Sequence, residues 1–522
     1  MTPATRAYRF RRAAIVPDGG AVLWPLAVLV ILAIYYSPVH LISVQTAITG
    51  LVGMGVVALA ARWPDRSLVL LVALLPFQGF ILAKLWAWGL PTPVVRHLGA
   101  WKEALALGVI LAGIRGYLAG GRRADALDRL ALGFVAIVAV YLLFQSLIVP
   151  GAPAPLSTRL LGFRQDAGFV LLLLGARHAP LPAGFLDRVG RVALAVAIVV
   201  AGVAVFEALD SAGWNHFVVN TIQYTRYQIG VLHGSPPNPF DIRIYGTVGG
   251  VRIIRTGSVF VSALACGFYL VLGFALALER SARGLGGRWI VPALVLIGAG
   301  ILLTQTRSAI LGALIVAWIG FRPAAGRRRH WRTQLAILVA ALAILAVPAA
   351  LSTGLARRFT APTSNGDNSA HVSGFWNGVH TIEHHPLGTG LGTSAGVGQQ
   401  FPTTGSEVVI PENNYLQVGI ELGVVPMIAF IALTLTLLRR LSAAARRSSQ
   451  PVLTAAWAAF AGLIVTAWFL QVWIDFAVAW TVWGVAGAAL GASRLAWPVV
   501  REAPAPAGVE AAVKRAERPL AA

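Results

Sequence analysis

One long polar segment, residues 373–425, interrupts an otherwise apolar chain and carries a motif near each end. The first motif is Trp376 followed by His385-Pro386-Leu387-Gly388-Thr389-Gly390-Leu391-Gly392. The second is Pro411-Glu412-Asn413-Asn414-Tyr415-Leu416-Gln417, which continues to Glu421-Leu422-Gly423. Carboxylate and imidazole groups can transfer protons, and amides can hold a substrate through hydrogen bonds. Because the segment then re-enters an apolar helix, it predicts a reaction site on a membrane scaffold.

Three side chains of the second motif share one helix face. Asn413, Gln417 and Glu421 are spaced four residues apart, so they form a polar stripe at the start of an otherwise apolar helix. We expect this stripe to face the substrate. The alternative is an ordinary helix start at which Glu412 acts as the capping residue.

The elements that position these residues are predicted to be membrane-spanning helices. Of the 522 residues, 57% are hydrophobic and 12% are charged, and long apolar runs recur along almost the whole chain. The alternating segments typical of a β-barrel are absent from the sequence. We therefore predict an all-α polytopic membrane protein of about 12–14 transmembrane helices with two long periplasmic loops. The apolar segments lie near residues 21–36, 41–61, 67–89, 100–114, 130–149, 166–176, 192–208, 257–278, 289–303, 308–321, 333–349, 415–438, 453–471 and 476–491.

Basic residues alternate between successive loops. Thirty of the 42 Lys and Arg residues fall in every second loop, which places both termini in the cytoplasm. This pattern accounts for most of the formal net charge of +22, so nucleic-acid binding is not predicted. The lone Cys266 lies inside a predicted span and is expected to be a packing residue.

The loops and spans divide the chain into six parts. The two long polar segments are expected above the helix bundle on the periplasmic side, where long connections usually carry function. The parts are N-terminal transmembrane helices (1–208), a periplasmic loop (209–256), central transmembrane helices (257–349), a large periplasmic loop with short helices (350–413), C-terminal transmembrane helices (414–492) and a disordered cytoplasmic tail (493–522).

Four motifs together resemble the bacterial O-antigen ligase and O-antigen or exopolysaccharide polymerase superfamily. Leu303-Thr304-Gln305-Thr306-Arg307-Ser308-Ala309 is similar to the family's Thr-x-Ser-Arg-Gly signature, with Thr306 where Ser is usual. The Trp376 and His-Pro-Leu-Gly segment and the Glu412 to Gly423 segment resemble two further family motifs. Arg255-Thr256-Gly257-Ser258 is similar to an Arg-x-x-Gly element. The resemblance covers roughly residues 250–440.

The resemblance implies a glycosyltransferase on the periplasmic side of the bacterial inner membrane. It would take a glycan from a polyprenyl diphosphate carrier and pass it to the hydroxyl of an acceptor glycan or lipid, without a metal, a nucleotide sugar or another cofactor. Polymerisation of an O-antigen or exopolysaccharide is the leading interpretation, and ligation to a lipid A core is the alternative. Membrane lipids and other polysaccharide assembly proteins are the further partners that it allows.

The resemblance also gives roles to individual residues. Arg307, with Arg255, Arg164 and Arg252, is expected to meet the charge that develops on the departing diphosphate. The family's ligases have a histidine where this chain has Glu412, so Glu412 is the predicted general base. His385 is the other catalytic candidate, and Trp376 is a candidate for stacking on a sugar. The glycines at 388, 390 and 392 are expected to form a tight turn near the acceptor path rather than a phosphate cradle.

Two other functions are weighed against this one. His380 and His384 have a spacing that zinc sites use, but the order His-Thr-Ile-Glu-His differs from His-Glu-x-x-His, so no metal site is predicted. A transporter or flippase for lipid-linked glycan would hold charged groups near the bilayer midplane, and only Lys84 fits that pattern clearly.

Overall fold

The structure is a computed structural model that describes residues 44–120, 124–149, 154–232, 238, 240–248, 251–321, 366–401 and 408–495. Within these residues, seven helices are long and apolar enough to cross a membrane. This confirms the predicted all-α polytopic membrane fold. The expected spans near 21–36 and 333–349, and nearly all of the tail after residue 493, lie outside the described residues.

The N-terminal part contains long helices and a few short ones. They are α2 (Val44–Arg62), α3 (Pro64–Leu74), η1 (Leu75–Phe77), α4 (Gln78–Ala87), α5 (Thr92–Leu98), α6 (Trp101–Ala119), α7 (Ala126–Ile148), α8 (Leu156–His178) and α9 (Phe185–Leu209). Their starts follow local rules, because Asp125 and Asp128 form a capping box on α7 and Pro64 occupies the first turn of α3.

The rest of the chain alternates long helices with short elements. The central part contains α10 (Ser211–His216), η2 (Phe217–Thr221), α11 (Tyr224–Gly230), β1 (Ile244–Val248), β2 (Val251–Arg255), η3 (Ser258–Phe260), α12 (Ala263–Ala282), η4 (Gly287–Trp289), α13 (Ile290–Leu303) and α14 (Arg307–Phe321). The last part contains α17 (Gly366–His384), α18 (Ala395–Gln400), α19 (Asn414–Leu422), α20 (Val424–Arg447), α21 (Pro451–Thr466) and α22 (Phe476–Leu495). Each apolar segment predicted within the described residues coincides with one or two of these helices.

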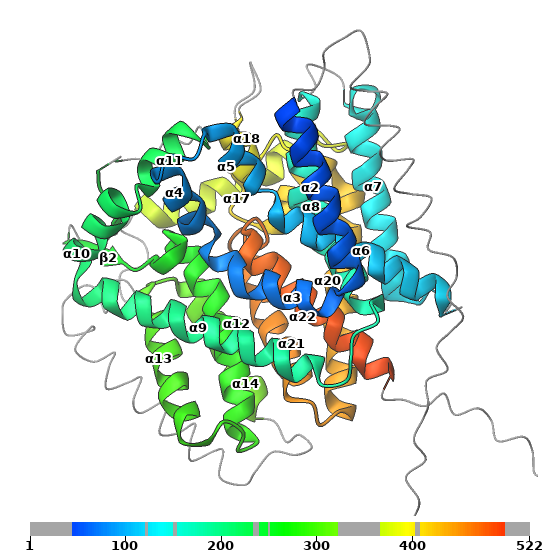
Figure 1. The fold of residues 1–522 in the computed structure, drawn as a ribbon. Coiled ribbons are helices and arrows are strands. Elements are labelled where there is room, and N and C mark those ends of the chain that lie inside the picture. The colour runs from blue at the N-terminus through cyan, green and yellow to red at the C-terminus, as the bar shows by residue number, and fades with distance from the viewer. Residues whose placement is uncertain are drawn as a thin grey trace, which may run out of the picture.

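The third predicted span is broken rather than continuous. Pro76 lies in η1, where α3 ends and α4 leaves in a new direction (Figure 1). Lys84 therefore sits in α4, where its Nζ donates a hydrogen bond to the Thr221 carbonyl (2.8 Å). Lys84, the one charged residue that fitted the transporter pattern, thus lies in a group of short helices. Its helix α4 packs on α5 and α11.

The predicted loop 209–256 contains secondary structure of its own. Besides α10 and α11 it holds β1 and β2, an antiparallel pair in which Val248 lies opposite Val251. Two glycines separate these valines in the sequence, and β-branched residues flank them, which favours a two-residue hairpin. This hairpin is the one departure from an all-helical fold among the described residues.

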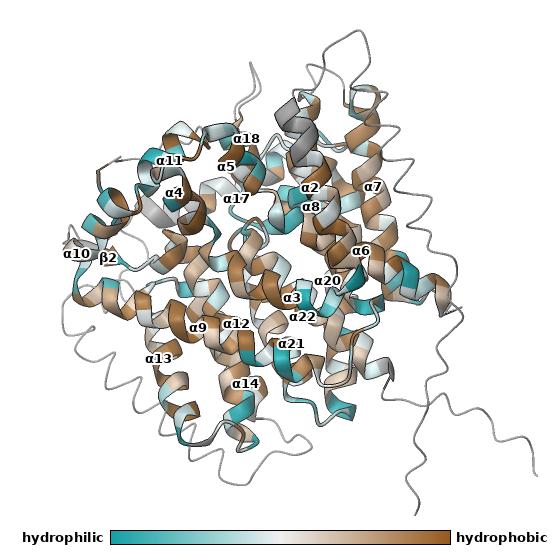
Figure 2. Ribbon diagram, in the orientation of Figure 1, coloured by the Kyte–Doolittle hydropathy of each residue, from teal (hydrophilic) through white to brown (hydrophobic). Residues whose placement is uncertain are grey.

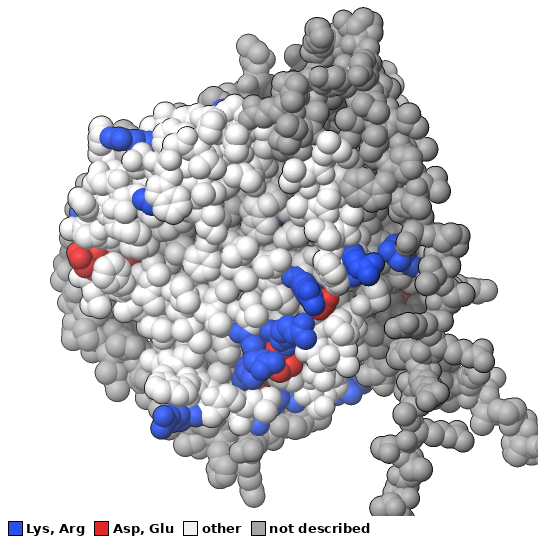
Figure 3. Space-filling view, in the orientation of Figure 1, with Lys and Arg blue, Asp and Glu red and all other residues white. Residues whose placement is uncertain are grey.

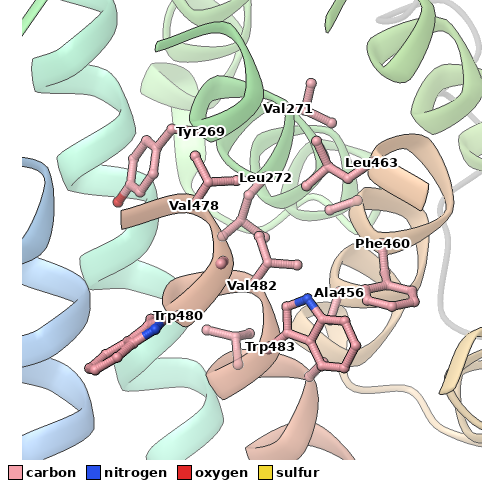
Figure 4. Packing of buried hydrophobic residues seen from close by; sticks show 14 of the residues in the cluster. Tyr269, Val271, Leu272, Ala456, Phe460, Leu463, Val478, Trp480, Val482 and Trp483 are labelled. Carbon is pink, nitrogen blue, oxygen red and sulfur yellow. The ribbon is translucent and has the colours of Figure 1, made fainter. Parts of the chain in front are cut away.

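The core lies where α8, α12, α21 and α22 pack together. Its centre is aromatic: Trp483 is fully buried, 4.7 Å from the Phe169 ring and 5.4 Å from the Phe460 ring. Figure 4 shows side chains of α12, α21 and α22, Trp483 among them, packed in one cluster. Hydrophobic colour dominates the long helices in Figure 2, and Trp473 and Trp480 are also buried in this core.

Contacts between the basic loops support the predicted alternation. Arg188 pairs with Asp65 (3.3 Å) and Arg280 pairs with Asp187 (3.0 Å), so three of these loops meet at one end of the bundle. Figure 3 shows basic and acidic side chains gathered in one band of this face, while much of the rest is uncharged. A band of charge at helix ends is typical of membrane proteins.

Candidate active site

The arginine motif lies where β2, α12, α13 and α14 meet. The Arg255 guanidinium donates from Nε to the Thr304 carbonyl (3.2 Å) and from Nη2 to Thr306 Oγ1 (3.2 Å). These threonines form the turn between α13 and α14, and Arg307 is the first residue of α14. Thr306 Oγ1 also donates to the Ala263 carbonyl (3.1 Å) at the start of α12. The structure therefore ties Arg255 to the turn that carries Arg307.

The C-terminal end of α21 holds the same turn from another side. Thr466 Oγ1 donates to the Ser308 carbonyl (3.0 Å), one residue beyond Arg307. Thr466 is fully buried, and Gly312 and Gly462 let α14 and α21 approach closely, since a Cβ on Gly462 would lie 2.6 Å from the Gly312 carbonyl oxygen. The position of α14 relative to α21 is thus set by backbone contact.

Ala467 and Trp468, which follow Thr466, hold the segment after Glu412. Asn414 N donates to the Ala467 carbonyl (3.0 Å), and Asn413 Nδ2 donates to the Trp468 carbonyl (2.8 Å). Residues 466–468 therefore anchor the segment after Arg307 and the segment after Glu412. We call this stretch the α21 anchor. It links the residues that directly follow the two predicted catalytic residues, Arg307 and Glu412.

Glu412 itself has an unusual backbone. Its φ of 46° lies in the left-handed region, which glutamate rarely adopts, and its side chain is half-buried. α17 packs against this point through Gly374, where a Cβ would lie 2.9 Å from the Ile410 carbonyl oxygen and 3.6 Å from Glu412 Cγ. Two residues along α17, Trp376 is 55% exposed and makes an edge contact with Phe375. The structure thus brings the Trp376 helix to Glu412.

In the predicted polar stripe, Gln417 and Glu421 lie in α19 and Asn413 directly precedes it, and all three are buried. Asn413, Gln417 and Glu421 are 0%, 1% and 0% exposed. Asn413 Oδ1 accepts hydrogen bonds from Tyr415 N (2.8 Å) and Leu416 N (2.9 Å). Asn413 is therefore the N-cap of α19, and the alternative in which Glu412 caps this helix is wrong.

The segment after His385 folds over the C-terminal end of α19. Thr389 N donates to the Ile420 carbonyl (2.7 Å), and Val424 N donates to the Pro386 carbonyl (3.0 Å). Gly388 has a φ of 82°, and a Cβ there would lie 2.5 Å from the Glu421 carbonyl oxygen. A close turn therefore requires glycine, as expected for this motif. The His385 side chain at its start is exposed.

The Glu421 carboxylate holds the far end of that turn. It accepts hydrogen bonds from Gly392 N (2.6 Å) and Ser394 Oγ (2.8 Å). The Asp166 carboxyl of α8 lies against it, and Asp166 Oδ2 has no hydrogen-bond partner among the described residues. Two carboxyl groups thus meet in the interior, where each charge is costly.

Arg164 lies apart from the other arginines, in a cluster of α6, α8 and α22. Its Nη1 is 3.0 Å from Glu103 Oε1, and its guanidinium lies 4.5 Å from the centre of the Phe476 ring. Lys102 approaches the same carboxylate (3.4 Å). Burial raises the pKa of the neighbouring Asp475 carboxyl, although its Oδ1 accepts a hydrogen bond from Val478 N (3.0 Å). Trp473 lies in the connection between α21 and α22, and its N–H donates to Asn414 Oδ1 (2.9 Å). Phe476 begins α22 at the end of this connection, so the connection contacts Asn414 at one point and Arg164 at another.

The remaining candidate residues are Arg252 and the histidines of α17. Arg252 pairs with Thr247 in the hairpin, and only its backbone is described. His380 Nδ1 lies 3.1 Å from Glu383, and His384 Nδ1 lies 2.7 Å from the His380 carbonyl oxygen, both on exposed turns of α17. Within the described residues, no three His, Cys, Asp or Glu side chains converge as metal ligands would.

A family model described as O-antigen ligase matches residues 292–431. The match supports the resemblance of the motifs to the O-antigen ligase and polymerase superfamily. No curated protein matches the chain significantly.

The matched residues include Arg307, Trp376, His385 and the whole of α19, whereas Arg164, Arg252 and Arg255 precede them. Side chains of α7, which lies outside these limits, bind the matched segment. Tyr141 of α7 donates from its hydroxyl to the Leu387 carbonyl (2.7 Å), and Gln145 Oε1 accepts from Leu391 N (2.8 Å).

Sequence reasoning missed these supporting residues. Gln145 and Asp166 are polar side chains at the edges of apolar segments, which is the signal that could have marked them. Their partners are more than 200 residues away, so the sequence could not show what they bind.

Proposed function

We propose that this protein is a glycosyltransferase that moves a glycan from a polyprenyl diphosphate carrier to an acceptor hydroxyl at the periplasmic face of the bacterial inner membrane. The proposed product is a surface polysaccharide, an exopolysaccharide or O-antigen, that grows by polymerisation. The α21 anchor carries this proposal, because it ties the start of α14 at Arg307 to the segment at Glu412. An inverting transfer needs a group that stabilises the charge on the leaving group and a base that accepts the acceptor's proton. A guanidinium and a carboxylate can fill these two roles.

Arg255 and Arg307 serve the leaving group in this proposal. As the bond between the anomeric carbon and the diphosphate oxygen breaks, negative charge develops on the diphosphate. Guanidinium groups bind phosphate oxygens as two-pronged donors, which an ammonium cannot do. Hydrogen bonds to Thr304 and Thr306 orient the Arg255 guanidinium in advance, so little reorganisation is needed during the reaction. Arg164 and Arg252 would hold more distant parts of the lipid-linked donor.

Glu412 serves the acceptor. The acceptor oxygen attacks the anomeric carbon on the face opposite the diphosphate, and its proton passes to the Glu412 carboxylate. His385 is the second candidate for proton transfer, and exposed Trp376 offers a ring on which a sugar can stack. Asn413, Gln417 and Glu421 are buried, so we propose that they act on the substrate through the segments that they hold.

Two observations bear on the alternative functions, ligation and transport. Ligation to a lipid A core is supported by the description of the matched family, but Glu412 replaces the histidine that the resembling ligases have. A transporter loses its main support, because Lys84 binds the Thr221 carbonyl among the short helices. We therefore place polymerisation first and ligation second.

The test is reconstitution with a defined donor. Purified protein in lipid is incubated with a polyprenyl diphosphate oligosaccharide, with and without a lipid A core acceptor, and with and without a chelator. A ladder of longer lipid-linked glycans supports polymerisation, and glycan on the core alone supports ligation. Movement of intact donor across the bilayer without any new glycosidic bond would contradict both. The expected activity is unchanged by the chelator.

A further inference from the structure

Glu207 is a buried acid in an otherwise apolar membrane helix, and the proposed mechanism leaves it unused. It lies two residues before the end of α9, a candidate span, and it is 2% exposed. Ionisable groups at such positions are costly, and they usually have a defined partner. Here the partner is a turn of the backbone.

The Glu207 carboxylate holds the turn that follows β2. Its Oε2 accepts hydrogen bonds from Gly257 N (3.0 Å) and Ser258 N (2.7 Å). Ser258 adds a second link to α9, because its Oγ donates to the Val200 carbonyl (2.8 Å). The turn is strained: Ser258 and Val261 have φ values of 49° and 50°. Strained backbone of this kind persists only where the surroundings hold it in place.

The turn begins immediately after Arg255. Thr256 N donates to the Leu303 carbonyl (3.2 Å), and Gln305 Nε2 donates to the Ile254 carbonyl (2.9 Å). The backbone on both sides of Arg255 is therefore bound to the end of α13, whereas Glu207 binds the next two residues to α9. In Figure 1, α9 crosses beside α12 and α13, and it contacts both helices.

We propose that Glu207 is a positioning residue for the diphosphate site: its carboxylate fixes the Gly257–Ser258 turn and thereby the distance between the Arg255 and Arg307 guanidinium groups. The inference rests on the proposed function. A displacement of about 1 Å at a binding group can reduce the rate roughly 100-fold, so an anchor outside the site can control transfer.

The test compares Glu207→Ala, which removes both acceptor contacts, with Glu207→Gln, whose amide oxygen can still accept from the two N–H groups. Glu279→Ala is the matched control, because Glu279 is equally buried (2% exposed) but pairs with Arg283 (3.4 Å) at the other end of α12. For each variant we would measure thermal unfolding, hydrogen exchange at Gly257 and Ser258, affinity for a sugar-free polyprenyl diphosphate, and kcat and KM for the oligosaccharide donor.

We expect Glu207→Ala to speed exchange at these two amides, weaken carrier binding and lower kcat/KM for the donor roughly 10- to 100-fold. Glu207→Gln should stay within about threefold of the natural protein, since a neutral oxygen still accepts both hydrogen bonds. Glu279→Ala should lower thermal stability yet leave kcat/KM of the folded protein unchanged. The double variant Glu207→Ala, Arg255→Ala should be no slower than Arg255→Ala alone.

Two results would overturn the inference. One is unchanged donor kinetics in Glu207→Ala despite faster exchange at the turn. The other is a fully additive loss in the double variant, which would mean that Glu207 acts independently of Arg255. If the natural protein binds the carrier but forms no glycosidic bond, the proposed function fails, and carrier affinity still reports whether Glu207 positions the arginines.

Discussion

Glu412 gives the sharpest test of the proposed reaction, because the structure separates its chemistry from its effect on stability. Asn413 supplies the α19 cap, so replacing Glu412 removes no capping hydrogen bond. Glu412→Gln keeps the size of the side chain but loses the basic carboxylate. If Glu412 is the base, turnover should fall roughly 10²–10⁴-fold, equivalent to about 3–5 kcal/mol of transition-state stabilisation. The free energy of unfolding should change by less than this, because glutamine has the same size and can form most of the same hydrogen bonds.

Glu412→Asn provides a second test, which uses the strained backbone at this position. The φ of 46° at this position costs a glutamate roughly 1–2 kcal/mol, and asparagine tolerates this region better. Glu412→Asn should therefore unfold at the same or a higher temperature while losing as much turnover as Glu412→Gln. Loss of stability together with activity in both variants would assign Glu412 a structural role.

The assay follows single-turnover transfer from a radiolabelled polyprenyl diphosphate oligosaccharide, with donor affinity measured separately. Glu412→His should retain part of the activity, with a pH profile shifted upward, because imidazole accepts a proton only when neutral, above its ordinary pKa of about 6.5. Full turnover in Glu412→Gln would refute the reasoning and transfer the role of base to His385 or another group.

Three further predictions test other parts of the site. Arg307→Lys should lower kcat/KM for the donor by a factor that corresponds to about 2–4 kcal/mol, at unchanged membrane yield, because an ammonium lacks the two-pronged geometry; near-normal transfer by Arg307→Ala would show an interfacial anchor only. Gly390→Ala should lower the unfolding temperature, because its φ is 114° and the new Cβ would lie 2.5 Å from Gln145 Nε2; an unchanged unfolding temperature would mean that the turn relaxes freely. Reporter fusions near Gly366 should read periplasmic and fusions at Arg446 cytoplasmic, and the reverse result would invert the topology.

The sequence by itself determined the class of the protein, most helix positions and the order of the motifs. Length, hydropathy and charge bias are local properties, so they predict where α12 or α22 begins and which loops share a side. Spacing also determined that Gln417 and Glu421 share a face of α19, with Asn413 at its N-cap. Spacing could not determine what that face contacts, because helical periodicity shows which residues share a face but not which other segments pack against it.

Only the tertiary structure decided what each of these groups binds. Glu421 holds the turn at Gly392, and Glu207 holds the turn after Arg255. The α21 anchor joins the residues that follow Arg307 and Glu412. These contacts link segments about 30–160 residues apart, and each depends on helices packing at one register. Buried polar groups need partners wherever the fold supplies them, and the packed bundle, rather than any local pattern, supplies them here.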